Sequence, residues 1–214
     1  MARDNRNRRQ ESLVRRRVLM LATRVPLQSG DGTPSFILDA AEAISGETEV
    51  LIVAPRIPGS TNRSRVGSVE VHRFPYAPRC RERLANDAIM PRLAVEPGLW
   101  AQAAALVGAM VAAGIRAHRE FRPDVVHAQW ILPAGLAALI LRFLFGTPYV
   151  LTARGADAFV LHGSLIGRLR RRVVAKAGRF VAVSDEIRRQ FADVRSDGHV
   201  QPSGVDLVAW ETLV

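Results

Sequence analysis

The chain has 214 residues, which is enough for one large domain or two small ones with a self-supporting core. Hydrophobic residues make up 48% of it and charged residues 23%, so it is not a disordered chain, a collagen-like repeat or a disulfide-rich miniprotein. Its net charge is +10, and its single cysteine, Cys80, excludes an intramolecular disulfide and a multi-cysteine zinc site.

The first segment in chain order is a basic tail. Residues 1–17 hold seven arginines and two acidic residues, and therefore half of the net charge. Such a tail favours contact with an anionic surface, although 29 arginines beside one lysine also fit a bias of genome composition. The apolar run 18–22 is too short for a secretory signal. We expect a disordered tail over 1–16 and a cytoplasmic protein, with contact to the inner face of the membrane as an option.

Behind the tail, short β-branched runs alternate with longer helical patterns, which is typical of βαβ units around a parallel sheet. The runs are continuously apolar, as expected for strands buried on both faces. We predict strands over 17–22, 50–54, 69–73, 124–128, 149–152 and 179–183. We predict helices over 34–45, 99–118, 133–145, 165–177 and 185–191, with long connections over 56–67 and 75–98 that are either mobile or functional. The fold class is therefore α/β, a Rossmann-like, doubly wound, mostly parallel sheet with helices on both faces.

The longest apolar stretch, 99–115, does not have the pattern of a membrane span. It is rich in Ala and Gly, contains Gln102, and is shorter than the roughly 20 residues that a bilayer requires. We predict a buried helix there.

The loop after the first strand is the first candidate site. Gly30, Asp31 and Gly32 precede a helix, with Thr33 as N-cap and Pro34 at the first helical position. Glycines let a ligand approach the backbone, and exposed N–H groups at a helix start favour a phosphate. The alternative is that these glycines only form a turn.

Polar side chains also follow the strands predicted at 124–128 and 149–152. His127, Gln129 and Trp130 stand at the end of one, and Arg154, Gly155 and Asp157 follow the other. These strand ends should be neighbours, and ligands of such sheets bind beyond the carboxyl ends of the strands. A structural role for His127, and a lid rather than a sugar-stacking role for Trp130, remain open.

Seven segments, taken together, resemble the amino-terminal half of a GT-B retaining glycosyltransferase of the group 1 or GT4 type. The resemblance runs from about residue 17 to the end of the chain, and no single motif is decisive. The segments are 17–21, 29–32, 122–130, 133–138, 147–157, 181–184 and 202–206.

The resemblance implies a two-domain enzyme that transfers a sugar from a nucleotide sugar to a glycan or lipid-linked acceptor. This half would bind the acceptor and contribute a glycine loop to the donor diphosphate. His127 and Asp157 would be catalytic, because they match the first histidine of the family's His-x-His and the aspartate of its His-Gly-x-Asp. The residues implied at the donor phosphates are Gly30, Asp31, Gly32, Thr33, Arg154 and Gly155. Those implied at the acceptor are Gln129, Trp130 and Ser184.

The chain departs from the family pattern at four points. Gln129 replaces the second histidine, Arg154 stands where histidine is commoner, and Ser203 replaces an asparagine. Arginine stays protonated and cannot act as a general base. The chain also ends at Val214, soon after the element that leads into the second domain. We therefore expect a domain over 17–206 and a truncated interdomain connection over 207–214. We also expect little sugar transfer without a partner chain that carries the donor-binding half. The chain could be a fragment, the product of a split gene or a degenerate relative, and all three alternatives stay open.

No Asp-x-Asp occurs, so we expect no metal and no cofactor, with the nucleotide sugar as a substrate. Two alternatives stay open. An NADP-binding oxidoreductase could use Arg56 for a 2′-phosphate, but its glycine fingerprint is misplaced. A non-catalytic basic module could dock on a membrane; aromatic residues do not interleave its arginines, so specific nucleic-acid binding is not expected. Its cations are those of the basic tail together with Arg168, Arg170, Arg171, Arg172, Lys176 and Arg179.

Overall fold

The computed structural model describes residues 15–28, 31, 33–86, 89–96, 98–155 and 164–204. Most of the predicted tail and the predicted connection 207–214 lie outside these residues. The strands are β1 (Arg16–Leu21), β2 (Thr48–Pro55), β3 (Arg63–Val66), β4 (Val69–Phe74), β5 (Val125–Gln129), β6 (Tyr149–Ala153), β7 (Arg179–Ala182) and β8 (His199–Val200). The helices are α2 (Phe36–Ser45), η1 (Arg79–Arg81), η2 (Leu84–Asn86), α3 (Ile89–Val95), α4 (Leu99–Phe121), η3 (Ile131–Gly135), α5 (Leu136–Phe145), α7 (Ser164–Lys176) and α8 (Asp185–Arg189).

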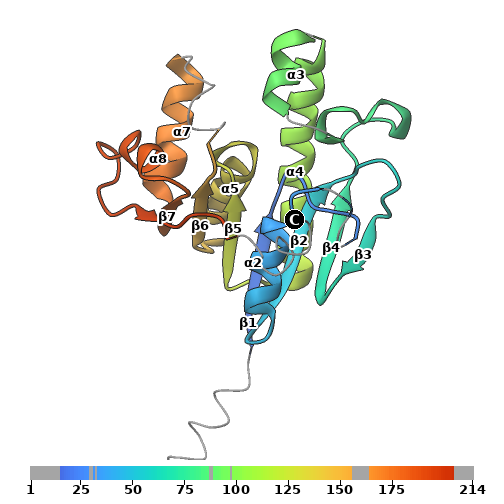
Figure 1. Cartoon of the computed structure of the whole chain (residues 1–214), viewed down its shortest axis with the longest axis horizontal. Coiled ribbons are helices and arrows are strands. Elements are labelled where there is room, and N and C mark those ends of the chain that lie inside the picture. The colour runs from blue at the N-terminus through green and yellow to red at the C-terminus, as the bar shows by residue number, and fades with distance from the viewer. Residues whose placement is uncertain are drawn as a thin grey trace, which may run out of the picture.

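The described strands form one eight-stranded sheet in the order β3-β4-β2-β1-β5-β6-β7-β8 (Figure 1). All neighbours are parallel except β3 and β4, which form an antiparallel edge pair. The strands β2, β4 and β3 lie on one side of β1, and the strands β5 to β8 lie on the other, so β1 pairs with both β2 and β5. This is the doubly wound α/β fold that the sequence predicts.

Two apolar cores cover the sheet, because successive residues of each strand face opposite sides. Leu19 and Leu21 of β1 belong to a core shared with α4, α5, α7 and α8. Val18 and Met20 belong to a second core shared with α2. Burial on both faces explains why β1 and β2 are continuously apolar over residues 18–21 and 50–54.

The predicted elements differ from the observed ones in the two long connections and in strand β8, which no predicted strand covers. The first contains the short strand β3, which pairs with β4 through a turn at Gly67. The φ of Gly67 is +56°, and a Cβ there would stand 1.6 Å from the Glu42 carboxylate, so glycine is favoured at this turn. The second connection contains η1, η2 and α3. The predicted cap of the first helix is wrong, because α2 starts at Phe36 after Ser35, and the Ser35 side chain does not cap it.

Helix α4 is buried along one stripe rather than all round, which corrects the prediction for 99–115. Leu106, Met110 and Ala117 of this stripe are buried, in a helix that contacts β1, β2 and α5. By length and hydropathy, α4 is apolar enough to cross a membrane, yet only 22% of its most apolar window is buried. The difference arises because the exposed side of α4 is built largely from Ala and Gly, which are apolar but small.

Candidate active site

The candidate site lies where β5 and β6 end side by side. The two strands are parallel, and Gln129 is in register with Thr152. His127 and Gln129 alternate with the core residues Val126 and Ala128, so they face the other side of the sheet, which α2 covers further along. The expectation that these two strand ends are neighbours is therefore confirmed.

His127 is held between two polar neighbours. Its Nε2 lies 2.9 Å from the Thr152 hydroxyl, and the Gln129 amide nitrogen lies 3.3 Å from Nε2 and 3.4 Å from Nδ1. Burial, and to a smaller extent the positive charge of Arg154, lower the pKa of His127 to about 4. The imidazole is therefore neutral near pH 7, where it can form hydrogen bonds but carries no charge.

Arg154, directly after β6, connects three parts of the site. Its Nε and one Nη donate to the side-chain amide oxygen Oε1 of Gln129 at 3.0 and 2.8 Å, and its other Nη donates to the Ser203 hydroxyl at 2.7 Å. The guanidinium carbon also lies 4.2 Å from the centre of the Phe36 ring. The result is a hydrogen-bonded series from Ser203 through Arg154, Gln129 and His127 to Thr152.

This series contains Gln129, Arg154 and Ser203, the three residues at which the resemblance implies another residue type. In the structure Arg154 bonds to both of the others. Gln129 is fully buried, and both ends of its amide have partners. The three residues therefore form one connected unit.

Trp130 stands at the start of the segment that leads into α5. Its backbone N–H donates to the Thr152 carbonyl at 2.8 Å, and its own carbonyl accepts from the N–H of Gly135 at 3.0 Å. Its φ of +91° lies in a region that side-chain-bearing residues rarely adopt. The ring makes an edge contact with Phe36 at 6.2 Å, so the partly exposed indole forms an aromatic pair beside Arg154.

The loop after β1 is closed by Asp31. Its carboxylate accepts from the backbone N–H groups of Leu27 at 2.6 Å and Thr33 at 2.8 Å. Desolvation alone would raise its pKa, but the bonds from Thr33 and Leu27 together lower it. Asp31 thus organises the loop from within, and Gly30 and Gly32 lie outside the described residues.

Sequence reasoning missed Arg73, which fastens the same loop. This β4 residue is 4% exposed, and one Nη donates to the carbonyl oxygens of Val25 at 2.9 Å and Pro26 at 2.8 Å. Its Nε has no hydrogen-bond partner within the described chain. The available signal was the position of Arg73 in β4, which alternates in phase with the buried Val69 and Val71 rather than with the polar Glu70 and His72.

The remaining predicted residues are placed less centrally. Ser184 follows β7 and caps α8 by accepting from the N–H of Ile187. Gly155 follows Arg154 with a φ of +124°, and Asp157 lies outside the described residues. Across the residues that the structure describes, no three His, Cys, Asp or Glu side chains gather closely enough to hold a metal ion.

The structure also shows the surroundings of the basic residues on which the two alternative functions depend. Arg56 forms an ion pair with Glu82 at 3.0 Å, and both side chains are largely buried. The Arg56 guanidinium is therefore not positioned to bind a 2′-phosphate. In the predicted basic cluster, Arg170 is buried under Phe191 and Arg171 pairs with Asp193. The exposed members of this cluster include Arg168, Arg172 and Lys176, which lie one turn apart along α7.

Comparison of the sequence with known proteins identifies the family of this chain. The family profile described as "Glycosyl transferase 4-like domain" matches residues 31–204. TuaC of Bacillus subtilis (strain 168), assigned to teichuronic acid biosynthesis as a glycosyltransferase, is 30% identical over 111 residues, which are 50% of this chain and 28% of TuaC.

Solved structures share the fold. Sucrose-phosphate synthase from Thermosynechococcus elongatus aligns with a TM-score of 0.61 at 11% identity, over 91% of this chain and 49% of that one. The catalytic domain of starch synthase IV from Arabidopsis thaliana, bound to ADP and acarbose, aligns with a TM-score of 0.59 at 10% identity, over 91% of this chain and 52% of that one. The chain thus spans about half the length of these structures. Since the family profile covers most of the described fold, the chain belongs to the glycosyl transferase 4-like family, with GT-B glycosyltransferases as its structural neighbours.

Proposed function

We propose that this chain is the acceptor-side half of a retaining glycosyltransferase that moves a sugar from a nucleotide sugar to a glycan or lipid-linked acceptor. The observation that carries the proposal is the hydrogen-bonded series at the ends of β5 and β6, centred on Arg154 and Gln129. It lies where α/β sheets bind ligands, in a chain of a glycosyltransferase family. The ADP and acarbose in the starch synthase relative support a nucleotide sugar and a glycan as the substrate classes.

In the proposed mechanism, catalysis comes from stabilising the charge that develops as the sugar leaves its diphosphate. The guanidinium of Arg154 is charged at every relevant pH, and it would face the leaving diphosphate together with the loop that Asp31 and Arg73 hold. The neutral His127 would donate a hydrogen bond to the transferred sugar, with Asp157 near the anomeric centre. Gln129, Trp130 and Ser184 would contact the acceptor. No metal ion takes part in the proposed steps.

We further propose that this half transfers little sugar by itself. In a GT-B enzyme the reaction takes place between two Rossmann-like halves, and loss of one well-placed charge-stabilising donor already costs about a hundredfold to a thousandfold in rate. The second half would lie in the same longer polypeptide or in a partner chain. The alignment of this chain with only about half of each solved structure supports this proposal.

Calorimetry with UDP, GDP and ADP tests the site directly. We expect weak but saturable binding of at least one nucleotide. The affinity of Arg154→Ala for that nucleotide should be about tenfold lower or more, because a charge-assisted contact is removed. Arg172→Ala, which removes the same charge from the exposed side of α7, serves as the control and should bind normally. Equal affinities in all three proteins would refute the proposed donor site.

A second proposal concerns location. The line of Arg168, Arg172 and Lys176 along α7, together with the neighbouring exposed Leu165, favours electrostatic docking on an anionic membrane surface from the cytoplasmic side. Binding to vesicles that contain anionic lipid should weaken between low and physiological salt. Salt-independent binding, or equal binding to neutral vesicles, would contradict it.

A further inference from the structure

A cavity with a polar rim lies on the opposite side of the sheet from the candidate active site. It has a volume of ≈ 220 Å³ and opens between α4 and the edge strands β3 and β4. Its sheet wall includes Phe74, which belongs to the core on the α4 side. Because β2 and β1 separate β4 from β5, the cavity stands about 14 Å along the sheet from His127 and faces the other way.

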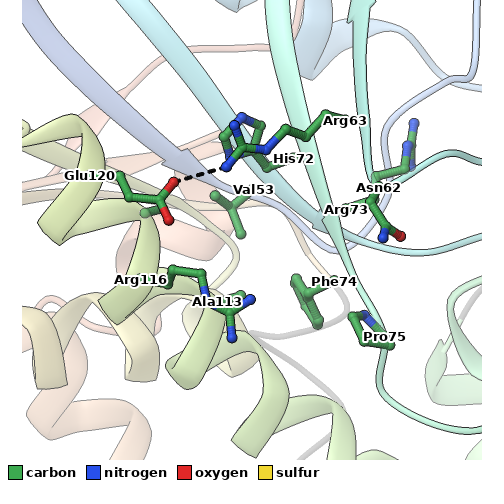
Figure 2. Close-up of a pocket in the computed structure, with 11 residues that line it drawn as sticks. Val53, Asn62, Arg63, His72, Arg73, Phe74, Pro75, Ala113, Arg116 and Glu120 are labelled. Atoms are coloured by element: carbon green, nitrogen blue, oxygen red, sulfur yellow. Dashed lines mark hydrogen bonds and ion pairs between the residues drawn. The ribbon is translucent and has the colours of Figure 1, made fainter.

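The cavity combines an apolar floor with a polar rim. Val53, Phe74, Ala113 and Ala117 supply carbon atoms from the sheet and from α4. On the rim, Arg63 of β3 and Glu120 of α4 form an ion pair at 3.0 Å, drawn as the dashed line in Figure 2. Both partners are about half exposed or more. Such exposed pairs contribute little, on the order of 0–1 kcal/mol, so an incoming anion can compete with Glu120 for Arg63.

Arg116 is the residue that the fold itself does not use. It lies one helical turn before Glu120, and Figure 2 shows its side chain extending from α4 towards Phe74. Within the described chain it has no hydrogen-bond or ion-pair partner. The side-chain amide of Asn62, across the cavity, likewise has no partner among the described residues. Two unengaged donor groups therefore border one small cavity.

These groups define the chemistry of a ligand. A guanidinium matches the geometry of a phosphate or carboxylate and can bind either in a bidentate manner. The apolar floor suits the carbon skeleton of an organic molecule, and the volume is below the roughly 300 Å³ at which pockets for drug-sized ligands begin. We propose that this cavity binds a small organic anion of about monosaccharide size that carries a phosphate or a carboxylate, with Arg116 as its principal contact.

Isothermal titration of the full chain with glucose 6-phosphate and with glucuronate tests the proposal. We expect saturable binding of at least one of them, and the stronger of the two identifies the anionic group. Neutral glucose should not bind measurably. Inorganic phosphate should bind more weakly than the preferred sugar anion, because it lacks a skeleton to cover the floor. Arg116→Ala should lower the affinity about tenfold to a hundredfold.

Arg119→Ala is the matched control. Arg119 is exposed on the same helix but does not line the cavity, so its removal should change the affinity by about twofold at most. Equal losses in both variants, absence of anion binding, or glucose binding as tightly as the anions would overturn the site. Inorganic phosphate binding as tightly as the sugar anions would overturn its organic ligand. UDP binding, measured in the same variants, should not change, so the outcome is independent of the proposed active site.

Discussion

Arg73 and Arg154 are the same residue type near the ends of two strands, but their surroundings differ. Arg73 is fully buried, and it bonds to backbone carbonyl oxygens of the loop after β1. Arg154 is partly exposed, and it bonds to the side chains of Gln129 and Ser203 and lies over an aromatic ring. An arginine that satisfies backbone carbonyls fixes a loop, whereas one that orders polar side chains at an exposed edge prepares a surface for a ligand.

The strongest test of this contrast is Arg73→Ala. Loss of the guanidinium leaves buried carbonyl oxygens of Val25 and Pro26 without donors, so the free energy of unfolding should fall by about 3 kcal/mol. Urea denaturation measures it. Arg65→Ala on β3, which is exposed, should stay within about 0.5 kcal/mol of the wild type. Similar values for the two variants would show that Arg73 does not hold the loop.

The pH dependence of the free energy of unfolding tests the environment of His127 beside Arg154. Because burial and Arg154 lower the pKa of His127 from 6.5 to about 4, the unfolded chain takes up a proton before the folded one does. Stability should therefore fall as the pH drops from about 6.5 to about 4, by about 3 kcal/mol for this residue.

The matching variant for this measurement is His127→Gln, which keeps a polar side chain but has no titrating group. The pKa of His118 is also lowered by burial, so only the difference between wild type and variant reports on His127. If denaturation curves at several pH values give the two proteins the same pH dependence, the low pKa of His127 is wrong.

The smallest effect concerns the coupling between Gln129 and Arg154. A double-mutant cycle with Gln129→Met and Arg154→Met should give an interaction energy of about 1 kcal/mol, because either single change already breaks their shared hydrogen bonds. A control cycle of Arg154→Met with the distant Arg65→Ala should be additive. Additivity in both cycles would mean that the replaced family residues act independently.

Most of the sheet could be predicted from sequence, because strands such as β2 are continuous apolar runs of a suitable length. Strand β3 could not, since Arg63, Ser64 and Arg65 form a polar edge that gains its order only by pairing with β4. Helix α4 was predicted, but its burial was overestimated because Ala counts as apolar wherever it lies.

The candidate site was predicted only at the level of its residues. His127, Gln129 and Arg154 were named because they follow strands, and the strand order brings them together. Their bonds could not be foreseen, since Arg154 meets Gln129 across 25 residues of sequence and Ser203 across 49. Arg73 was missed because a single arginine in a strand does not reveal whether it faces solvent or a loop.

We propose that the ends of β5 and β6 form a nucleotide-facing surface organised by Arg154. An NMR titration of the chain with UDP that follows the side-chain amide of Gln129 and the indole N–H of Trp130 tests this most directly. Both resonances should shift in a saturable way in the wild type and stay still in Arg154→Ala. Saturable shifts confined to residues around Arg116, with Gln129 and Trp130 unmoved, would contradict it.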